Sequence, residues 1–255
     1  MKIGIAGYGF VGKVHSEVLR NWHDVEISDP AYPEYSRSSF SSDVDAIIIC
    51  VSTPQSKWGT CYMNNVFAVL DAAPNVPVLI KSTISINGWE MLQDAFPDRQ
   101  ITFSPEFLRA ATAIEDFKNC KRLLMGGGNT TFWSNIFRQA MIGDVEIEIS
   151  TAKELILAKY ARNTFLALKV SYFNQMFDLC EELGLDYSEV RKYTIEDERI
   201  GASHTDVTDD RGYGGHCFPK DVAALVTSTK HLNTELTILE AAQLYNDRIR
   251  KHKDA

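Results

Sequence analysis

Short apolar runs alternate with amphipathic stretches over the first 150 residues, and this alternation limits the fold more than any other feature. The runs lie at residues 2–7, 24–29, 46–53, 76–83, 100–105, 121–127 and 144–150. Two of them, AIIIC and VPVLI, are apolar at consecutive positions, as is typical of strands covered on both faces. Strands that alternate with helices imply βαβ units. We therefore predict an α/β fold with a doubly wound parallel sheet over residues 1–150.

The pattern changes after residue 150. Residues 151–183 contain neither glycine nor proline and carry apolar residues at helical spacing, which predicts one long helix. A shorter helix at 185–194, a polar loop at about 201–216 and two helices at about 219–230 and 235–252 follow. Residues 151–255 are therefore predicted to form an all-helical second domain.

Composition argues against several classes of function. The 255 residues, 45% of them hydrophobic, are enough to bury a sizeable core. A net charge of −8 disfavours an electrostatic nucleic-acid binder. No apolar stretch approaches the roughly 18–20 residues of a membrane span, and the N-terminus lacks the pattern of a signal peptide. The cysteines are scattered without metal-ligand spacing, so we expect free thiols, a cytoplasmic setting and no metal site.

The first chemical motif is GYGFVG at residues 7–12. GxGxxG alone is weak evidence, but here it follows a predicted strand and opens a predicted helix, which is the required context. Gly9 lets the backbone approach a pyrophosphate, which rests on the helix N-terminus. Asp29 ends the next strand, where an acid binds the ribose hydroxyls and repels a 2′-phosphate. The motif therefore predicts a Rossmann-like domain that prefers NAD to NADP.

A single cysteine stands in an unusual setting within GYGGHCFPKD, residues 212–221. Three glycines in four residues let the backbone bend closely around a ligand, and Pro219 suits the first turn of a helix. Cys217 would lie just ahead of that helix, where the positive end of the dipole lowers the pKa of a thiol. This setting favours a nucleophile, although a lone cysteine is more often a buried small side chain.

Other candidate residues are less specific. Thr53 and Thr83, each preceded by serine, place hydroxyls at the carboxyl ends of strands, where ligands of such sheets bind; they could equally form turns. Glu106 follows a strand and a proline, a position where most glutamates are solvated. Lys159 and Asn163 are four residues apart on the long helix and share a face, which could also be plain surface.

Together these residues resemble one family over nearly the whole chain. The motifs GYGFVG, VSTP, KSTI, SPEFLR, KYARNTFLA, ERIG and GYGGHCFPKD occur in the order and spacing of the UDP-glucose dehydrogenase (nucleotide-sugar 6-dehydrogenase) family. Its members oxidise a primary alcohol to a carboxylate in two NAD-dependent steps. The resemblance implies oxidation of a nucleotide sugar, UDP-glucose to UDP-glucuronate first of all, and a homodimer through the helical domain. It also leads us to expect that the family's C-terminal UDP-binding domain is lacking.

The resemblance assigns roles to individual residues. The implied catalytic residues are Cys217 as nucleophile with Lys159, Asn163, Asp221 and Glu106. The implied NAD-binding residues are Gly7, Tyr8, Gly9, Phe10, Val11, Gly12, Asp29, Thr53, Thr83 and Lys220. The implied substrate-binding residues are Phe107, Leu108, Arg109, Lys159, Asn163, Arg199, Tyr213 and Gly214. Arg199 resembles an arginine that in some members reaches the substrate across a dimer interface.

The two-step chemistry explains why a thiol is needed. Loss of the first hydride turns the alcohol into an aldehyde, and a second hydride can leave only from a tetrahedral adduct. A thiolate forms that adduct, and its oxidation gives a thioester that water cleaves. Lys159 and Asn163 suit the oxyanion that develops at each addition.

Two other interpretations stay open. A β-hydroxyacid-type dehydrogenase shares a Rossmann domain, a helical domain and a catalytic lysine, but it needs no cysteine nucleophile. A non-catalytic protein could bind NAD or a nucleotide sugar without turnover. The segment SHTDVTDD, which replaces HFL-type residues between Arg199 and Cys217, leaves the sugar preference open.

Overall fold

The computed structural model describes residues 1–37, 39–108, 112–141, 145–230 and 232–251. The chain forms two compact units, Met1–Pro54 with Cys61–Lys159, and Gln55–Thr60 with Tyr160–Ala255. The division between the units falls inside one long helix. The assignment of functional domains to residues 1–150 and 151–255 stays a prediction.

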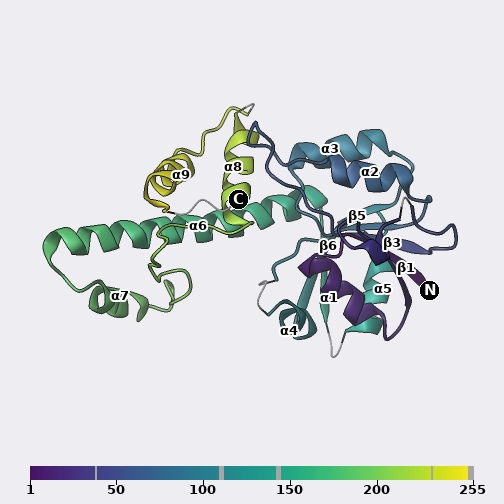
Figure 1. Ribbon diagram of the computed structural model, residues 1–255, viewed down its shortest axis with the longest axis horizontal. Helices are drawn as coiled ribbons and strands as arrows, with labels where there is room; N and C mark the ends of the chain where they lie inside the picture. Colours follow the sequence, from purple (N-terminus) through teal and green to yellow (C-terminus); the bar gives the residue numbers. More distant parts are fainter. Residues whose placement is uncertain (38, 109–111, 142–144, 231, 252–255) are drawn as a thin grey trace. The chain divides into compact units, whose positions relative to one another are not determined.

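One seven-stranded sheet forms the centre of the first unit (Figure 1). Its strands lie in the order β2-β1-β3-β4-β5-β6-β7, and all seven predicted strands are confirmed. Their bounds are β1 (Lys2–Ala6), β2 (Asp24–Ser28), β3 (Ala46–Ile49), β4 (Val78–Ile80), β5 (Ile101–Phe103), β6 (Arg122–Gly127) and β7 (Glu146–Ser150). In the register of the central strands, Ile3 lies opposite Val25 on one side and Ala46 on the other.

One pair of strands departs from the predicted parallel arrangement. β5 and β6 are antiparallel, whereas the other neighbours run parallel. The described part of their connection carries α4 (Ala113–Lys118), a helix of six residues. Such a helix is about 9 Å long, too short to bring the chain back along the sheet. The chain therefore enters β6 from the end at which β5 stops.

Helices cover both faces of the sheet, as a doubly wound fold requires (Figure 1). On one face lie α1 (Phe10–Leu19), α4 and α5 (Thr130–Ala140); on the other lie α2 (Asn64–Ala72) and α3 (Ile86–Ala95). β3 is buried at all four positions, which explains the consecutive apolar residues of AIIIC. Ile5, Ile48 and Phe137 are among the side chains buried under the first set of helices.

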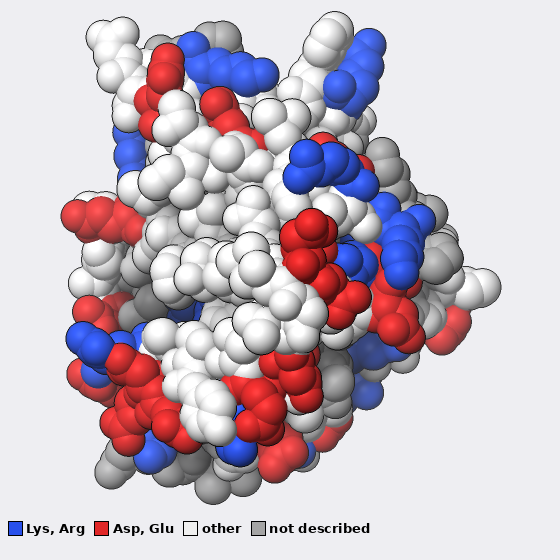
Figure 2. Space-filling view, turned by 90° about the vertical axis from the view of Figure 1, so that its left-hand side faces the viewer, with Lys and Arg blue, Asp and Glu red and all other residues white. Residues whose placement is uncertain are grey.

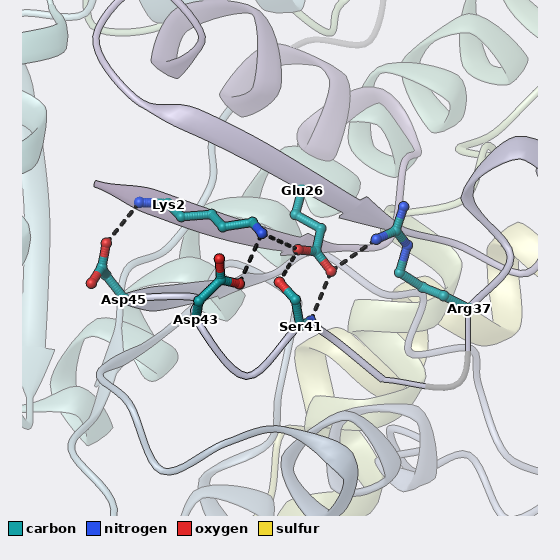
Figure 3. A network of polar contacts seen from close by, with 6 residues as sticks. All are labelled: Lys2, Glu26, Arg37, Ser41, Asp43 and Asp45. Atoms are coloured by element: carbon teal, nitrogen blue, oxygen red, sulfur yellow. Dashed lines mark hydrogen bonds and ion pairs between the residues drawn. The ribbon is translucent and has the colours of Figure 1, made fainter.

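A polar network attaches the loop after β2 to the sheet (Figure 3). Glu26 of β2 accepts the backbone N–H of Ser41 at 2.9 Å and also binds its hydroxyl. Arg37 lies 2.8 Å and Lys2 3.3 Å from the same carboxylate, whose side chain is only 7% exposed. The sequence predicts this segment only as a polar loop; the structure shows that it supplies two of the three partners of a buried acid, Arg37 and Ser41.

The regular elements described in the second unit are helices. They are most of α6 (Ala152–Leu183), with α7 (Tyr187–Ile195), α8 (Phe218–Thr229) and α9 (Thr237–Ile249). The predicted long helix is confirmed at 32 residues. It ends at Gly184, where the N–H groups of Gly184 and Leu185 bond back to the carbonyls of Glu181 and Cys180. Among the described helices, none is both long and apolar enough to cross a membrane.

The second unit has a small core of its own. Its buried members are Ala167, Tyr213, Val222, Val226 and Leu239, contributed by α6, the loop before α8, α8 and α9. The core thus holds the GYGGHCFPKD segment against three helices. The predicted fold class, a Rossmann-like sheet followed by a helical part, is confirmed.

Candidate functional site

The glycine-rich turn connects β1 to α1 at the carboxyl edge of the sheet. Gly9 is the N-cap of α1, and within the described residues no side chain caps that end of the helix. Apart from its chain neighbours and its own helix, no atom of the described residues lies within 4 Å of a Cβ placed at Gly9, so the space beside it is open. The first N–H groups of a helix point outward and attract anions. The residues here therefore fit the pyrophosphate of NAD.

Asp29 follows β2 and reaches this turn. Its Oδ2 accepts the N–H of Tyr8 at 2.6 Å, and its Oδ1 accepts the N–H of Ala31 at 2.8 Å. A carboxylate offers about four acceptor positions, so the half-buried Asp29 keeps capacity for ribose hydroxyls. The ring of Tyr8 packs edge-on against Tyr32 and Tyr35, at centroid distances of 5.5 and 5.0 Å. Sequence reasoning did not identify these two tyrosines as neighbours of the glycine-rich turn.

The other residues predicted for NAD in the first unit lie along the same edge. Thr53 and Thr83 follow β3 and β4, and the hydroxyl of Thr53 donates to the carbonyl of Thr83 at 2.7 Å. Phe10 begins α1 with 44% of its surface exposed, and Val11 and Gly12 follow in the same helix. The structure therefore gathers the predicted strand-end hydroxyls and the glycine-rich turn on one edge of the sheet.

Glu106, which follows β5, is held by a lysine that sequence reasoning missed. The Nζ of Lys81 lies 3.0 Å from the Glu106 carboxylate and donates to the hydroxyl of Ser104 at 3.1 Å. The lysine side chain is 1% exposed and the glutamate side chain 10%. A lysine that ends the buried apolar run VPVLI was the available signal, because a buried ammonium group needs an anionic partner.

The charges around Glu106 decide its ionisation. Burial alone would raise the pKa of Glu106, but the basic groups around it, Lys81 foremost, together outweigh burial and hold the pKa below its ordinary value. Lys159 contributes in the same direction. Burial, aided by Lys81, lowers the pKa of His15 to about 4, so this imidazole is neutral near pH 7. Phe107 and Leu108 are half-buried beside Glu106 in sequence, and Arg109 lies outside the described residues.

In the second unit the structure brings three predicted residues together. Asp221 of α8 is 1% exposed, and its carboxylate accepts from Asn163 of α6 at 2.6 Å and from Lys220 at 2.7 Å. Lys220, predicted to bind NAD, is therefore an ion-pair partner of Asp221 here. Lys159 lies one turn before Asn163 on α6 and is buried.

Cys217 is the exposed cysteine among the five free thiols. It is the N-cap of α8, with Pro219 in the first turn, as the sequence predicts. The carbonyl of Cys217 accepts the N–H of Asp221 at 2.9 Å. One helical turn therefore separates Cys217 from Asp221, the carboxylate that Asn163 and Lys220 bind. By contrast, desolvation raises the pKa of the Cys50 thiol to about 12, which makes Cys50 a poor nucleophile.

Three other residues predicted to bind substrate make no contact with Asn163, Lys220 or Asp221 among the hydrogen bonds and ion pairs of the described residues. The Arg199 side chain is 89% exposed and forms a pair of contacts with Asp197, at 2.5 Å and 3.1 Å. The ring of Tyr213 is 3% exposed within the core of the unit, so its backbone is the accessible part. Gly214 is half-buried in the loop before Cys217. Their roles stay predictions.

A groove of about 800 Å³ runs along α6 and α9 of the second unit. Its lining is mostly apolar and includes Phe165, Tyr172 and Ile238, with exposures of 63%, 54% and 76%. Arg199 also lines it, whereas Cys217, Asn163 and Asp221 do not. Figure 2 shows the molecule from the left-hand side of Figure 1, where uncharged residues gather between acidic and basic ones. The groove is therefore distinct from the candidate site formed by Cys217, Asn163 and Asp221.

Two family models match the chain. Residues 34–140 match the NAD binding domain of the UDP-glucose/GDP-mannose dehydrogenase family, and residues 153–248 match its central domain. The UDP-glucose 6-dehydrogenase of Rhizobium meliloti is 28% identical over 97% of this chain and 68% of its own length. Two other curated relatives with the same name are covered over 52% and 49% of their length. The chain thus spans between about half and two thirds of these relatives.

Solved structures agree with the fold. A UDP-glucose dehydrogenase from the archaeon Pyrobaculum islandicum matches with a TM-score of 0.82 and 26% identity, over 97% of this chain and 68% of that one. A 3-hydroxyisobutyrate dehydrogenase from Mycobacterium tuberculosis matches with a TM-score of 0.74 and 18% identity, over 99% and 95%, which shows a shared fold only. With the NAD-binding and central domains both matched, the chain belongs to the UDP-glucose/GDP-mannose dehydrogenase family.

Proposed function

We propose that the protein oxidises the C6 alcohol of a nucleotide sugar to a carboxylate with NAD, and that UDP-glucose is the substrate to test first. The observation that carries this proposal is the exposed Cys217 at the start of α8, one turn from a carboxylate bound to Asn163 and Lys220. The three curated relatives named above are UDP-glucose 6-dehydrogenases, which favours this substrate.

NAD, when bound, accepts one hydride in each of two oxidations. After the first, the alcohol has lost a hydride and a proton, and the Cys217 thiolate adds to the aldehyde carbon. A proton returns to the resulting alkoxide and gives a thiohemiacetal. Loss of a hydride and a proton from this adduct leaves a thioester on Cys217. Water then attacks the thioester carbonyl and the C–S bond breaks. The carboxylate leaves, two protons are released and the Cys217 thiolate is restored. Overall, one alcohol, one water and two NAD give one carboxylate, two NADH and three protons.

The remaining candidate residues have proposed roles around these steps. Lys159 and Asn163 stabilise the oxyanion that forms at each addition to a carbonyl. Asp221 accepts protons, and its two partners hold its carboxylate in one orientation. Glu106, kept ionised by Lys81, assists the attack of water on the thioester.

A second copy of the chain is the proposed partner. The groove along α6 and α9 exposes apolar side chains that a monomer would leave in water, and an apolar patch of this kind favours association. A symmetric dimer would cover the same patch on both copies. Arg199 lines this groove, which supports the proposal that it acts near the neighbouring copy. The free thiols support a reducing, cytoplasmic setting.

The test is a count of NADH formed per nucleotide sugar. We expect two NADH per UDP-glucose from the parent protein, and loss of acid formation in Cys217→Ser, because a hydroxyl lacks the nucleophilicity of a thiolate. Cys120→Ser is the matched control, since Cys120 is a free thiol outside the cluster. Complete conversion to the uronic acid by Cys217→Ser would refute the covalent mechanism.

The same assay separates the two alternatives. A β-hydroxyacid-type dehydrogenase, whose fold this chain shares, would release one NADH per substrate and would tolerate loss of the thiol. A non-catalytic protein would bind NAD in a titration and give no NADH with UDP-glucose, UDP-N-acetyl sugars or GDP-mannose.

A further inference from the structure

The segment that precedes Cys217 is attached to two helices through its backbone. In residues 210–213, five backbone groups bond to α6, α9 or the residues just after α9. The carbonyl of Asp210 accepts the N–H of Lys251, and the carbonyl of Arg211 accepts the Arg250 guanidinium, both at 3.0 Å. A surface loop seldom has this many fixed groups, because most loops are hydrated.

Asn246 of α9 makes the closest of these attachments. Its Oδ1 accepts the N–H of Tyr213 at 2.7 Å, and its Nδ2 donates to the Tyr213 carbonyl at 3.1 Å. Asn246 is 5% exposed, so water does not compete for these bonds. Gly212 has a φ of +54°, and a Cβ there would lie 2.2 Å from Oδ1 of Asn246. A glycine is therefore required where the loop meets α9.

Asn174 of α6 holds Arg211 and Gly212, the two residues before Tyr213. Its Oδ1 accepts the N–H of Gly212 at 3.0 Å and the Nε of Arg211 at 2.9 Å. Arg211 has a φ of +59°, which a residue with a Cβ adopts only when its surroundings hold it there. An ion pair with Asp178 completes this arrangement. Asn174 is 1% exposed, so it too acts in a dry site.

The two asparagines fix the chain at Gly212 and Tyr213, and Tyr213 lies four positions before Cys217. Only residues 214–216 separate Tyr213 from Cys217, which α8 holds on its other side. A loop anchored at both ends over so short a span has few conformations, whereas a loop anchored at one end has many. Within the described part of the chain, neither asparagine forms a hydrogen bond with Cys217 itself.

We propose that Asn246 and Asn174 are positioning residues that set the place of the loop carrying Cys217. This inference rests on the proposed role of Cys217 as nucleophile. It makes α9 part of the catalytic apparatus, because a shift of α9 would move Tyr213 through Asn246.

Hydrogen exchange tests the attachment without any assay of activity. In Asn246→Leu we expect the peptide that spans residues 208–217 to exchange at least about tenfold faster, while the α8 peptide is unchanged. Gln243→Ala, one turn earlier on α9, is the matched control and should exchange like the parent. If Asn246→Leu fails to fold, Asn246→Asp keeps the acceptor for Tyr213, loses the donor, and should show a smaller increase.

Kinetics test the positioning role. Asn246→Leu should lower kcat at least about tenfold and leave the KM for NAD within about twofold, because all the residues predicted to bind NAD except Lys220 belong to the first unit. Asn174→Leu should behave similarly, whereas Asn174→Asp keeps the acceptor for Arg211 and Gly212 and should retain kcat within about threefold.

Each outcome decides the matter. Unchanged exchange in Asn246→Leu would overturn the attachment, and faster exchange with an unchanged kcat would overturn the positioning role. If the parent turns over no nucleotide sugar, the proposed function fails, and the rate at which iodoacetamide alkylates Cys217 replaces kcat. A change of at least about threefold in Asn246→Leu then supports the positioning of the loop, and an unchanged rate refutes it.

Discussion

Lys81 and Glu106 show how strongly a single buried ion pair can constrain a site. Both charges are removed from water in the first unit, at a separation of 3.0 Å. Loss of one partner leaves the other charged and unpaired, which costs about 3–5 kcal/mol. An exposed pair such as Lys118 with Glu17 is worth about 0–1 kcal/mol.

We therefore predict that Lys81→Met lowers the free energy of unfolding by about 3–5 kcal/mol, and that Lys118→Met changes it by less than about 1 kcal/mol. Urea denaturation measures both. Adding Glu106→Gln to Lys81→Met should restore part of the loss, since the buried charge is then gone. Equal costs for the two lysine variants would contradict the buried pair.

Asp29 is the residue that should decide between the two nicotinamide cofactors. Its carboxylate accepts two backbone N–H groups and keeps acceptor capacity toward the turn. Asp29→Ala should weaken NAD binding about tenfold, or ~1.4 kcal/mol, and narrow the difference between NAD and NADP. Asp29→Asn removes the charge but keeps an acceptor, so it should weaken NAD less than alanine does. Titrations that give equal affinities for NAD and NADP in the parent would rule this role out.

At the scale of elements, the loop after β2 is held by charge. Burial alone would raise the pKa of Glu26, but its bonds from Ser41, Lys2 and Arg37 outweigh burial and lower it (Figure 3). A carboxylate whose folded pKa lies below its unfolded value of about 4.5 stabilises the fold above that pH. This stabilisation is lost as the pH falls through the folded pKa.

Glu26→Gln should therefore be less stable than the parent by about 1 kcal/mol at pH 7, and the difference should shrink below about pH 4.5. Denaturation in urea at pH 7 and at pH 3.5 measures this change. Glu146→Gln, which removes a carboxylate from an exposed pair on β7, is the control. A difference that stays constant between the two pH values would contradict the network.

At the scale of the whole molecule, the groove on the second unit bears on assembly. Ile238 and Phe165 project apolar surface into it and are exposed in one copy of the chain. We predict a homodimer through this groove, with a mass near twice the 28.7 kDa of one chain in light scattering at micromolar concentration. An active monomer at that concentration would refute the dimer.

A charge placed in the groove tests where the copies meet. Ile238→Asp should raise the dissociation constant at least about 30-fold, the change expected for an interface residue worth ~2 kcal/mol. Leu232→Asp adds the same charge at an exposed leucine outside the groove and should leave the mass unchanged. If both variants stay dimeric, the copies associate through another surface.

Local patterns determined much of this protein. Seven apolar runs predicted seven strands, the absence of glycine and proline predicted α6, and GYGFVG predicted the glycine-rich turn between β1 and α1. These features repeat with the period of a strand or helix, or lie within a few residues, so neighbouring positions suffice to specify them. Pro219, which suits the first turn of a helix, also predicted that Cys217 lies just ahead of α8.

Only the tertiary structure decided which distant polar groups meet. The pairing of Lys81 with Glu106, the bond from Asn163 to Asp221, and the hold of Asn246 on Tyr213 each join residues at least 25 positions apart. A single asparagine in an amphipathic helix has no periodicity that marks its partner. The antiparallel direction of β6 likewise depends on the short helix α4, because the end of α4 sets the edge of the sheet from which the chain enters β6. Long-range contacts of single side chains depend on how whole elements pack, and no local pattern records that packing.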